Sequence, residues 1–186
     1  MRDGRSGEPG PGIVYRVLRA AEAGRIAEID RAESVAMLYE VRGGEVAPRG
    51  RGCEVPQWSG DWLAHEIAFV RRHLEAGATA LGAFADDRLV GVGVLGSAPV
   101  RGDAGELQLA FVHVGRAHRR RGVAGHLVGE LRAAALRLGA RRLYISATPS
   151  DSALGFYLGL GARLAEPVDA ELFALEPEDV HLVLDL

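Results

Sequence analysis

The sequence lacks both lysine and asparagine, so all 22 of its basic side chains are arginine. It has one cysteine, Cys53, which excludes an internal disulfide framework and a cysteine-rich zinc site and fits a reducing compartment. We expect this thiol to be half-buried and inert, because no histidine-containing motif surrounds it. We expect no metal cofactor.

The chain also lacks an excess of positive charge and a long apolar run. Its net charge of -3 argues against a general nucleic-acid binder, which needs a surplus of basic side chains over a broad face. No segment approaches the roughly 20 apolar residues that span a bilayer, and no signal-peptide core follows the N-terminus. We therefore predict no contact with nucleic acid or membrane, and a cytoplasmic location.

The first twelve residues are rich in glycine and proline, which predicts a disordered tail over residues 1–12. The remaining chain, residues 13–186, has the length of one ordinary domain, and a hydrophobic content of 48% supplies enough apolar side chains for its core.

The most informative stretch runs from Glu106 to Gly125. Its first nine residues are apolar and β-branched enough for a strand, a basic turn follows, and a helical apolar stripe begins at Val123. The first N–H groups of a helix lack intrahelical partners and form the positive end of its dipole, so the small residues Gly122 and Ala124 let an anion approach the main chain. The stretch predicts a phosphate-binding turn; the alternative is a solvated basic loop that caps a helix.

Periodicity predicts an α/β domain with a mixed sheet along the rest of the chain. Strands are expected at residues 13–19, 79–85, 89–95, 141–147, 162–165 and 180–185, and helices at 20–30, 60–75, 123–138 and from about 150 to 161. Residues 31–58 look irregular apart from a hairpin at 39–46, residues 96–105 are expected to form a loop, and an acidic segment covers 166–179.

Two motifs carry a family resemblance. Arg119-Arg120-Arg121-Gly122-Val123-Ala124 is similar to the pattern Gln/Arg-x-x-Gly-x-Gly/Ala of the GNAT-type N-acetyltransferases, in which the turn binds the pyrophosphate of acetyl-CoA. Residues 150–161, with Ala153, Phe156, Tyr157 and Gly161, resemble the second signature of that family, Asn-x-x-Ala-x-x-Phe/Leu-Tyr-x-x-x-Gly. Arg116 stands where many members have proline, and Ser150 where many have asparagine, although serine caps helices as well as asparagine does. Residues 29–33 and 176–182 resemble, more faintly, a bacterial subgroup.

The resemblance implies a mixed, mostly antiparallel central sheet flanked by helices on both faces. It also implies acetyl-CoA as co-substrate and direct attack by a primary amine in a ternary complex. The residues that it assigns to cofactor binding are Phe111, Val112, Val114, Arg119, Arg120, Arg121, Gly122, Val123, Ala124, Gly125 and Ser150.

Acetyl transfer needs an acid and a base. The resemblance implies that Tyr157 protonates the thiolate leaving group, for which a phenol with a pKa of roughly 10 is suited; packing at a helix–sheet boundary is the alternative. Glu106 is the first candidate for the general base; the alternative is that it is simply an exposed carboxylate at the end of a strand. Glu33 and Glu40 are the other candidates for the base. A lone histidine such as His113 is more often structural.

The acceptor is less defined. We expect a small-molecule amine, and the acidic side chains of residues 166–179 either steer a cationic amine or form a solvated face. Two roles are open for Trp58, Trp62 and Tyr39: their rings stack on a substrate, or they only pack against the rest of the protein. A catalytically silent acetyl-CoA sensor of the same fold is an alternative function, and a homodimer is an alternative to a monomer. A nucleotide-phosphate enzyme is disfavoured, because the chain lacks a Gly-x-x-x-x-Gly-Lys-Ser/Thr loop.

Overall fold

The computed structural model describes residues 12–186, which form two compact units. Unit 1 contains the described residues up to Ala32, Pro56–Ser97 and Phe111–Ala134, and unit 2 contains Glu33–Val55, Ala98–Ala110 and Ala135–Leu186. The single domain expected over residues 13–186 stays a prediction. The predicted N-terminal tail, except Gly12, lies outside the described residues.

Unit 1 is built on strands that hydrogen-bond in the order β1 (Ile13–Val17), β6 (Thr79–Ala85), β7 (Arg88–Val100) and β8 (Asp103–Val114), the last two of which extend into unit 2. β1 and β7 both run antiparallel to β6. Asp86 and Asp87 have φ angles of 47° and 62°, as a tight hairpin turn requires, so the predicted β6–β7 hairpin is confirmed.

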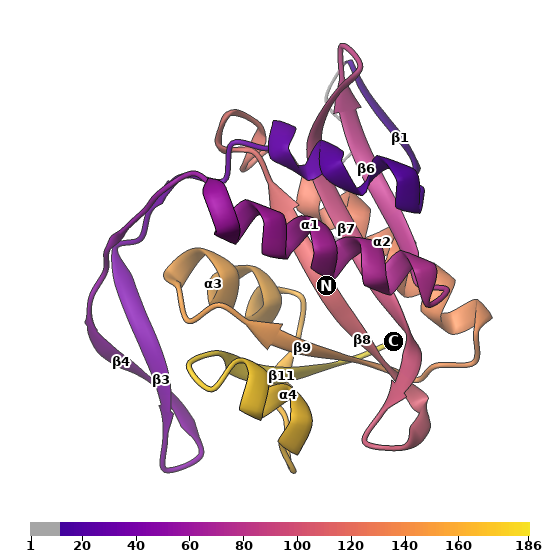
Figure 1. Cartoon of the computed structure of the whole chain (residues 1–186). Helices are drawn as coiled ribbons and strands as arrows, with labels where there is room; N and C mark the ends of the chain where they lie inside the picture. Colours follow the sequence, from indigo (N-terminus) through magenta and orange to yellow (C-terminus); the bar gives the residue numbers. More distant parts are fainter. Residues whose placement is uncertain (1–11) are drawn as a thin grey trace, which may run out of the picture. The chain divides into compact units, whose positions relative to one another are not determined.

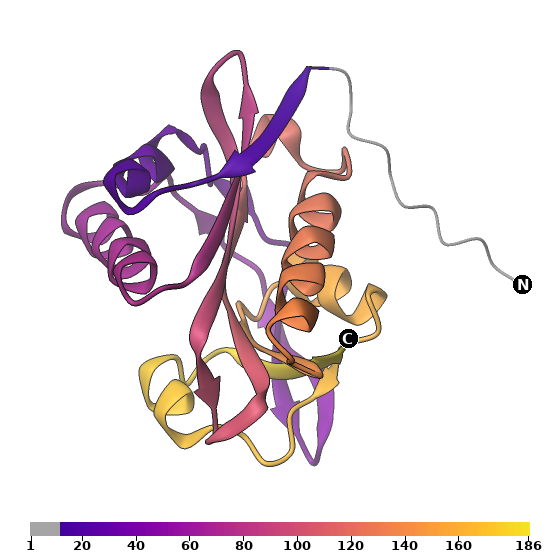
Figure 2. The same ribbon diagram turned by 90° about the vertical axis from the view of Figure 1, so that its right-hand side faces the viewer.

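Helices cover both faces of the unit 1 strands (Figure 2). The 3₁₀ helix η1 (Ala20–Glu28) and α1 (Gly60–Glu75) lie on one face and α2 (Val123–Arg137) on the other. In the helix predicted at residues 60–75, the apolar stripe made by Leu63, Ile67, Val70 and Leu74 packs into a cluster with β6 and β7. The predicted stripe of α2 enters a second cluster through Val123 and Leu127.

Two glycines of β7 bring α2 close to the strands. A Cβ atom on Gly91 would lie 3.1 Å from Cγ1 of Val123, and one on Gly93 would lie 2.8 Å from Cδ1 of Leu131. Since side chains at these positions would push the helix outward, the glycines fix the start of α2 and the turn that precedes it.

Unit 2 contains the first part of β8, followed in hydrogen-bonding order by β9 (Arg142–Ala147), β11 (Val180–Asp185) and β10 (Arg163–Leu164) (Figure 1). β8 and β9 are parallel, and the other two pairings are antiparallel. The unit also contains α3 (Asp151–Gly159), α4 (Ala170–Leu175), the hairpin of β3 (Met37–Arg42) and β4 (Glu45–Arg51), and the short pair β2 (Glu33–Ser34) and β5 (Glu54–Val55). The fold is therefore a mixed α/β fold with a mostly antiparallel sheet, as expected.

The structure corrects three predictions. The hairpin in residues 31–58 extends to Arg51, because β4 pairs along its length with β3. The predicted loop at residues 96–105 is a tight turn, in which Arg101 and Gly102 have φ angles of 54° and 71° between two long strands. Cys53 is exposed rather than half-buried. The acidic segment, for which the sequence predicts no particular element, contains α4. Among residues 12–186, no helix is long and apolar enough to cross a membrane.

Candidate functional site

The basic turn of unit 1 is held by main-chain hydrogen bonds at the end of β8. The N–H of Gly115 donates to the carbonyl of Val90, and the N–H of Arg116 donates to the carbonyl of Asp30, both at 2.8 Å. A 3₁₀ turn, η2 (Arg116–His118), then leads to Arg119. Because both bonds reach neighbouring elements of the same unit, the strand exit is fixed although proline is missing from it.

Arg119 anchors the turn. Its Nε donates to the carbonyl of Val114 at 3.0 Å and its Nη2 to the carbonyl of Arg31 at 2.9 Å. Arg120 and Arg121, in contrast, are exposed. The three arginines of the motif therefore divide into one that orders the main chain and two whose charges face solvent.

The main chain of the turn suits an anion. Arg120 and Gly122 have φ angles of 61° and 80°, and such residues let successive N–H groups converge into an anion-binding nest. A Cβ atom on Gly122 would meet nothing within 4 Å, so the space above the turn is open. The N–H of His126 bonds to the carbonyl of Gly122 at 2.9 Å, so the N–H groups of residues 123–125 precede the helical ladder of α2. These donors fit a pyrophosphate group at the positive end of the α2 dipole.

The end of β8 before the turn is packed by aromatic rings. Phe111 is buried and lies 6.0 Å from Trp58, centroid to centroid, in a stacked arrangement. His113 contacts both rings, at 4.9 Å from Trp58 and 4.5 Å from Phe111. Burial, and then the positive charges of Arg31 and Arg119, lower the pKa of His113 to about 3. The ring is therefore neutral at pH 7, which favours the expected structural role.

The two tryptophans differ in environment. Trp58 is 4% exposed and belongs to the unit 1 core, which favours packing over substrate stacking. Trp62 is 40% exposed, and the guanidinium of Arg31 lies 4.5 Å from its ring centroid.

In unit 2, Ser150 begins α3. Its Oγ accepts a hydrogen bond from the N–H of Ala153 at 3.2 Å, which confirms the helix cap expected at this position. The N–H of Tyr39 donates to the carbonyl of Pro149 at 2.9 Å, which ties β3 to the start of the same helix. The contact of Ser150 with a cofactor stays a prediction.

Tyr157 lies in α3 and is 8% exposed. Burial raises the pKa of its hydroxyl well above the usual value, and the negative charge of Asp179 raises it further. The phenol is therefore protonated at neutral pH, as a proton donor must be before it acts.

Glu106 is fully buried and bound by two arginines. Its carboxylate forms a bidentate pair with Arg101, with Nε–Oε2 at 2.8 Å and Nη2–Oε1 at 2.6 Å, and Nε of Arg142 lies 3.2 Å from Oε1. Both oxygens are engaged, so this environment argues against proton abstraction and favours a structural role. The base role of Glu106 stays a prediction.

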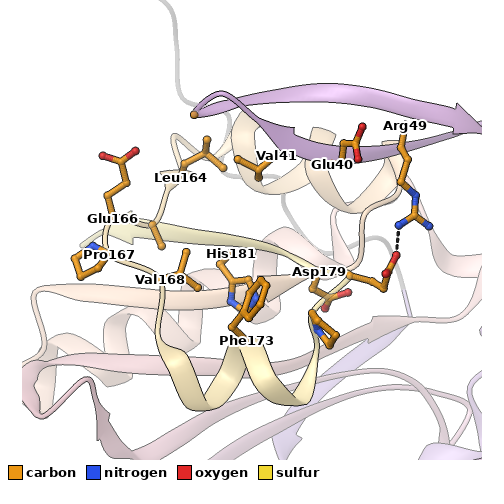
Figure 3. A pocket seen from close by; sticks show the side chains of 14 residues that line it. Glu40, Val41, Arg49, Leu164, Glu166, Pro167, Val168, Phe173, Asp179 and His181 are labelled. Carbon is orange, nitrogen blue, oxygen red and sulfur yellow. Dashed lines mark hydrogen bonds and ion pairs between the residues drawn. The ribbon is translucent and has the colours of Figure 1, made fainter.

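A cavity of about 510 Å³ lies wholly within unit 2 (Figure 3). Figure 3 shows Glu40 on the β3–β4 hairpin, with Asp179 and His181 beneath it. Its lining residues are Glu40, Val41, Gly44, Arg49, Leu164, Ala165, Glu166, Pro167, Val168, Phe173, Pro177, Glu178, Asp179 and His181. Carboxylates outnumber the single arginine, which is bonded to Glu178. Of the other base candidates, Glu40 lies in this wall and Glu33 lies in β2.

His181 of this cavity belongs to a hydrogen-bond chain. Its Nδ1 lies 2.9 Å from the hydroxyl of Tyr144, which accepts from the N–H of Asp169 at 2.9 Å. Its Nε2 lies 3.4 Å from the carbonyl of Glu176. Burial lowers the pKa of His181, so the neutral ring accepts from Tyr144 and carries its proton on Nε2.

Sequence reasoning missed Asp179 as an individual group. It was one member of the acidic segment, whereas the structure places it partly buried in the cavity wall and in electrostatic contact with Tyr157. Its position beside the start of β11 was the available signal. Among the described residues, no three His, Cys, Asp or Glu side chains gather as metal ligands.

Solved structures share the fold over 64–94% of this chain. Nourseothricin acetyltransferase superposes with a TM-score of 0.65 at 20% identity, covering 94% of this chain and 98% of the other. The PaiA N-acetyltransferase of Thermoplasma acidophilum, in complex with coenzyme A, gives 0.62 at 15% identity, with 94% and 99% covered. A GNAT family acetyltransferase of Elizabethkingia anophelis with acetyl-CoA bound gives 0.51 at 17% identity, with 64% and 82% covered.

By sequence, no curated protein matches the chain. The sequence model of the acetyltransferase (GNAT) family matches residues 49–162, which include the basic turn, the helix α2 and the Tyr157 motif. Since this match covers more than half of the sequence, the chain belongs to the acetyltransferase (GNAT) family.

Proposed function

We propose that the protein is an acetyl-CoA-dependent N-acetyltransferase that acts on a primary amine of a small molecule by direct attack. Membership of the family implies acyltransferase activity, and the relatives with bound coenzyme A or acetyl-CoA make acetyl-CoA the natural donor. The observation that carries the proposal is the basic turn of unit 1, where open main chain and helix N–H groups meet two exposed arginines.

The residues of unit 1 bind the donor. The N–H groups of residues 121–125 and the side chains of Arg120 and Arg121 hold the pyrophosphate, and Arg119 keeps the turn in shape. Phe111, Val112 and Val114 lie along the pantetheine arm. When bound, acetyl-CoA supplies the thioester whose acyl group is transferred.

The residues of unit 2 supply proton transfer and the acceptor pocket. Tyr157 donates the proton that neutralises the thiolate, and the carboxylates of the 510 Å³ cavity attract an amine in its ammonium form. The ladder between β8 and β9 covers Glu106–Gln108 and Arg142–Tyr144, so residues 145–147 of β9 have no ladder partner in β8 among the described residues. Ser150 follows this free edge.

The first experiment separates donor binding from fold strain. Gly122→Ala and Gly139→Ala both place a Cβ at a positive φ, +80° and +85°, with nothing within 4 Å. Both variants lose a similar stability of about 1 kcal/mol, but only Gly122→Ala also weakens acetyl-CoA binding, because its methyl group stands above the turn. Equal calorimetric acetyl-CoA affinities of the two variants contradict the phosphate cradle.

The second experiment separates an enzyme from a silent acetyl-CoA sensor. Release of CoA is followed with 1,4-diaminobutane, lysinamide and a peptide with a free N-terminus. Turnover with any amine supports the enzyme, and tight acetyl-CoA binding without turnover supports the sensor. Tyr157→Phe is expected to lower kcat more than acetyl-CoA affinity, and unchanged kcat at saturating substrate removes the acid role.

The cytoplasmic location, bacterial origin and homodimer stay predictions.

A further inference from the structure

Asp179 occupies a fixed position in the wall of the acidic cavity. Its N–H donates to the carbonyl of Glu176 at 3.1 Å, and the next residue, Val180, pairs with Ala147 at the start of β11. Figure 3 shows its side chain among the residues that line the cavity. The main chain around Asp179 is therefore held by hydrogen bonds, which fixes the point from which its side chain enters the cavity wall.

Among residues 12–186, the groups that interact electrostatically with Asp179 are Tyr157 and Glu176, and neither is a cation. Tyr157 of α3 interacts with it electrostatically, and Glu176 adds a like charge. Across the cavity, Glu40 and Glu166 are further carboxylates. The arginine of the cavity wall, Arg49, is bonded to Glu178.

The remaining titratable group of the wall, His181, is unsuited to take a proton. Its Nδ1 lone pair accepts from Tyr144 and its Nε2 faces the carbonyl of Glu176. Protonating Nδ1 would break the bond to Tyr144 in a buried site. Asp179 is thus a carboxylate of the cavity wall that also interacts electrostatically with the proposed acid, Tyr157.

We propose that Asp179 is the general base that deprotonates the ammonium group of the acceptor bound in this cavity. This role rests on the proposed N-acetyltransferase function. Asp179 removes one proton from the ammonium, holds it while the acetyl group is transferred and releases it to solvent afterwards. The amine nitrogen then bonds to the acyl carbon as the carbon–sulfur bond breaks, Tyr157 gives its proton to the departing thiolate, and Tyr157 recovers a proton from the nitrogen as the amide forms. The products are the acetylated amine, CoA thiol and one proton in solvent.

Electrostatics support this assignment. Burial, and then the charge of Glu176, raise the pKa of Asp179 to about 7, near the pH at which a base is most effective. Asp179 and Tyr157 are also coupled, because the carboxylate charge raises the pKa of the phenol. When Asp179 accepts a proton this charge disappears, so the step that activates the amine also makes Tyr157 a stronger acid.

The test compares Asp179→Asn with Glu166→Gln, which removes one carboxylate from the same cavity. The pH–rate profile is measured with the best acceptor among 1,4-diaminobutane, lysinamide and the peptide. For Asp179→Asn, we expect kcat at pH 7 to fall by roughly 100-fold and the rise in rate near pH 7 to disappear. For Glu166→Gln, we expect a higher KM and the same profile as the parent. Asp179→Glu, which keeps the carboxylate, is expected to retain the rise with a reduced kcat.

A second acceptor distinguishes a base from a merely structural residue. 2,2,2-Trifluoroethylamine is largely unprotonated at neutral pH and needs no base, so its acetylation by Asp179→Asn is expected to fall by less than about threefold. An equal loss with both kinds of amine, or a parental pH profile in Asp179→Asn, overturns the base role and leaves the N-acetyltransferase standing. If the parent protein acetylates no amine, the proposed function fails and the base role fails with it.

Discussion

Glu106→Gln distinguishes a structural carboxylate from a catalytic one. Glu106 is fully buried, and it binds Arg101 through two hydrogen bonds and Arg142 through a third contact. Glutamine keeps the shape but removes the charge, and its NH₂ group must face a guanidinium donor. Breaking a buried pair by removal of one partner costs about 3–5 kcal/mol. Arg101 and Arg142 are 19% and 35% exposed, so water partly compensates them, and we expect a loss of about 2–4 kcal/mol.

Thermal unfolding, followed by circular dichroism, measures this loss. For a chain of this length, each kcal/mol lowers Tm by roughly 2–4 °C, so Glu106→Gln is expected to melt roughly 5–15 °C below the parent. Asp103→Asn is the matched control, because Asp103 also pairs with Arg142, at 3.1 Å, but is 34% exposed. Its Tm is expected to fall by clearly less than that of Glu106→Gln, because solvent screens this ion pair.

The pH–rate profile of Glu106→Gln gives the refutation. If Glu106 is structural, the variant keeps the parental profile at temperatures well below its Tm. A variant with unchanged Tm that has lost the ascending limb of the profile refutes this reasoning and restores Glu106 as the base.

Three further predictions concern stability, measured by urea unfolding. The pKa of His113 falls from 6.5 to about 3 on folding, so the unfolded chain binds the proton first, and unfolding free energy drops by up to about 1.4 kcal/mol per unit as pH falls through this window. His113→Gln is expected to remove this pH dependence, whereas His65→Gln, at an exposed position of α1, is expected to keep it. If the unfolding free energies of His113→Gln and the parent change with pH in the same way, the burial of His113 is contradicted. For Asp179 the pH dependence of stability has the opposite sign, because its pKa rises on folding from 3.8 to about 7 and stability is lost as pH rises through this window. Asp179→Asn is therefore expected to be more stable than the parent at pH 8 and similar to it at pH 4; equal stability of the two proteins at both pH values contradicts the shift. Gly52→Ala places a Cβ atom 1.7 Å from the carbonyl oxygen of Val35 and is expected to lose more than about 2 kcal/mol, whereas Gly50→Ala meets nothing within 4 Å; equal effects contradict the close approach.

The elements that the sequence predicts well are those whose signal is local. The apolar stripes of α1 and α2 recur at helical spacing, and the β6–β7 hairpin has a short polar turn between two apolar runs. α4 was missed because it has six residues, too few to show a period, and because Leu172 packs against a cluster formed by distant strands. The sequence predicts a loop instead of the turn at Arg101 because polar residues and glycines surround it.

Glu106 shows why a site residue escapes local reasoning. Its position at a strand end suggested an exposed carboxylate or a base. The strand register instead pairs Glu106 with Arg142, which lies 36 positions further along the chain, and the tight turn brings Arg101 to the same carboxylate. Neither partner has a fixed sequence spacing from which the ion pair follows, so only the pairing of β8 with β9 reveals it.

The two halves of the proposed reaction, donor binding and proton transfer, also differ in how far local sequence specifies them. In the proposal, binding of the pyrophosphate relies on main-chain N–H groups and a positive φ at Gly122, which lie within one short stretch of sequence. Proton transfer depends on the surroundings of Asp179, to which α3, the hairpin and the segment before β11 each contribute. Within the acidic run, the position of Asp179 directly before a strand is a weak sequence signal; its burial and its uncompensated charge separate it clearly from its neighbours. Donor chemistry is therefore readable from a motif, whereas the base has to be found by its environment.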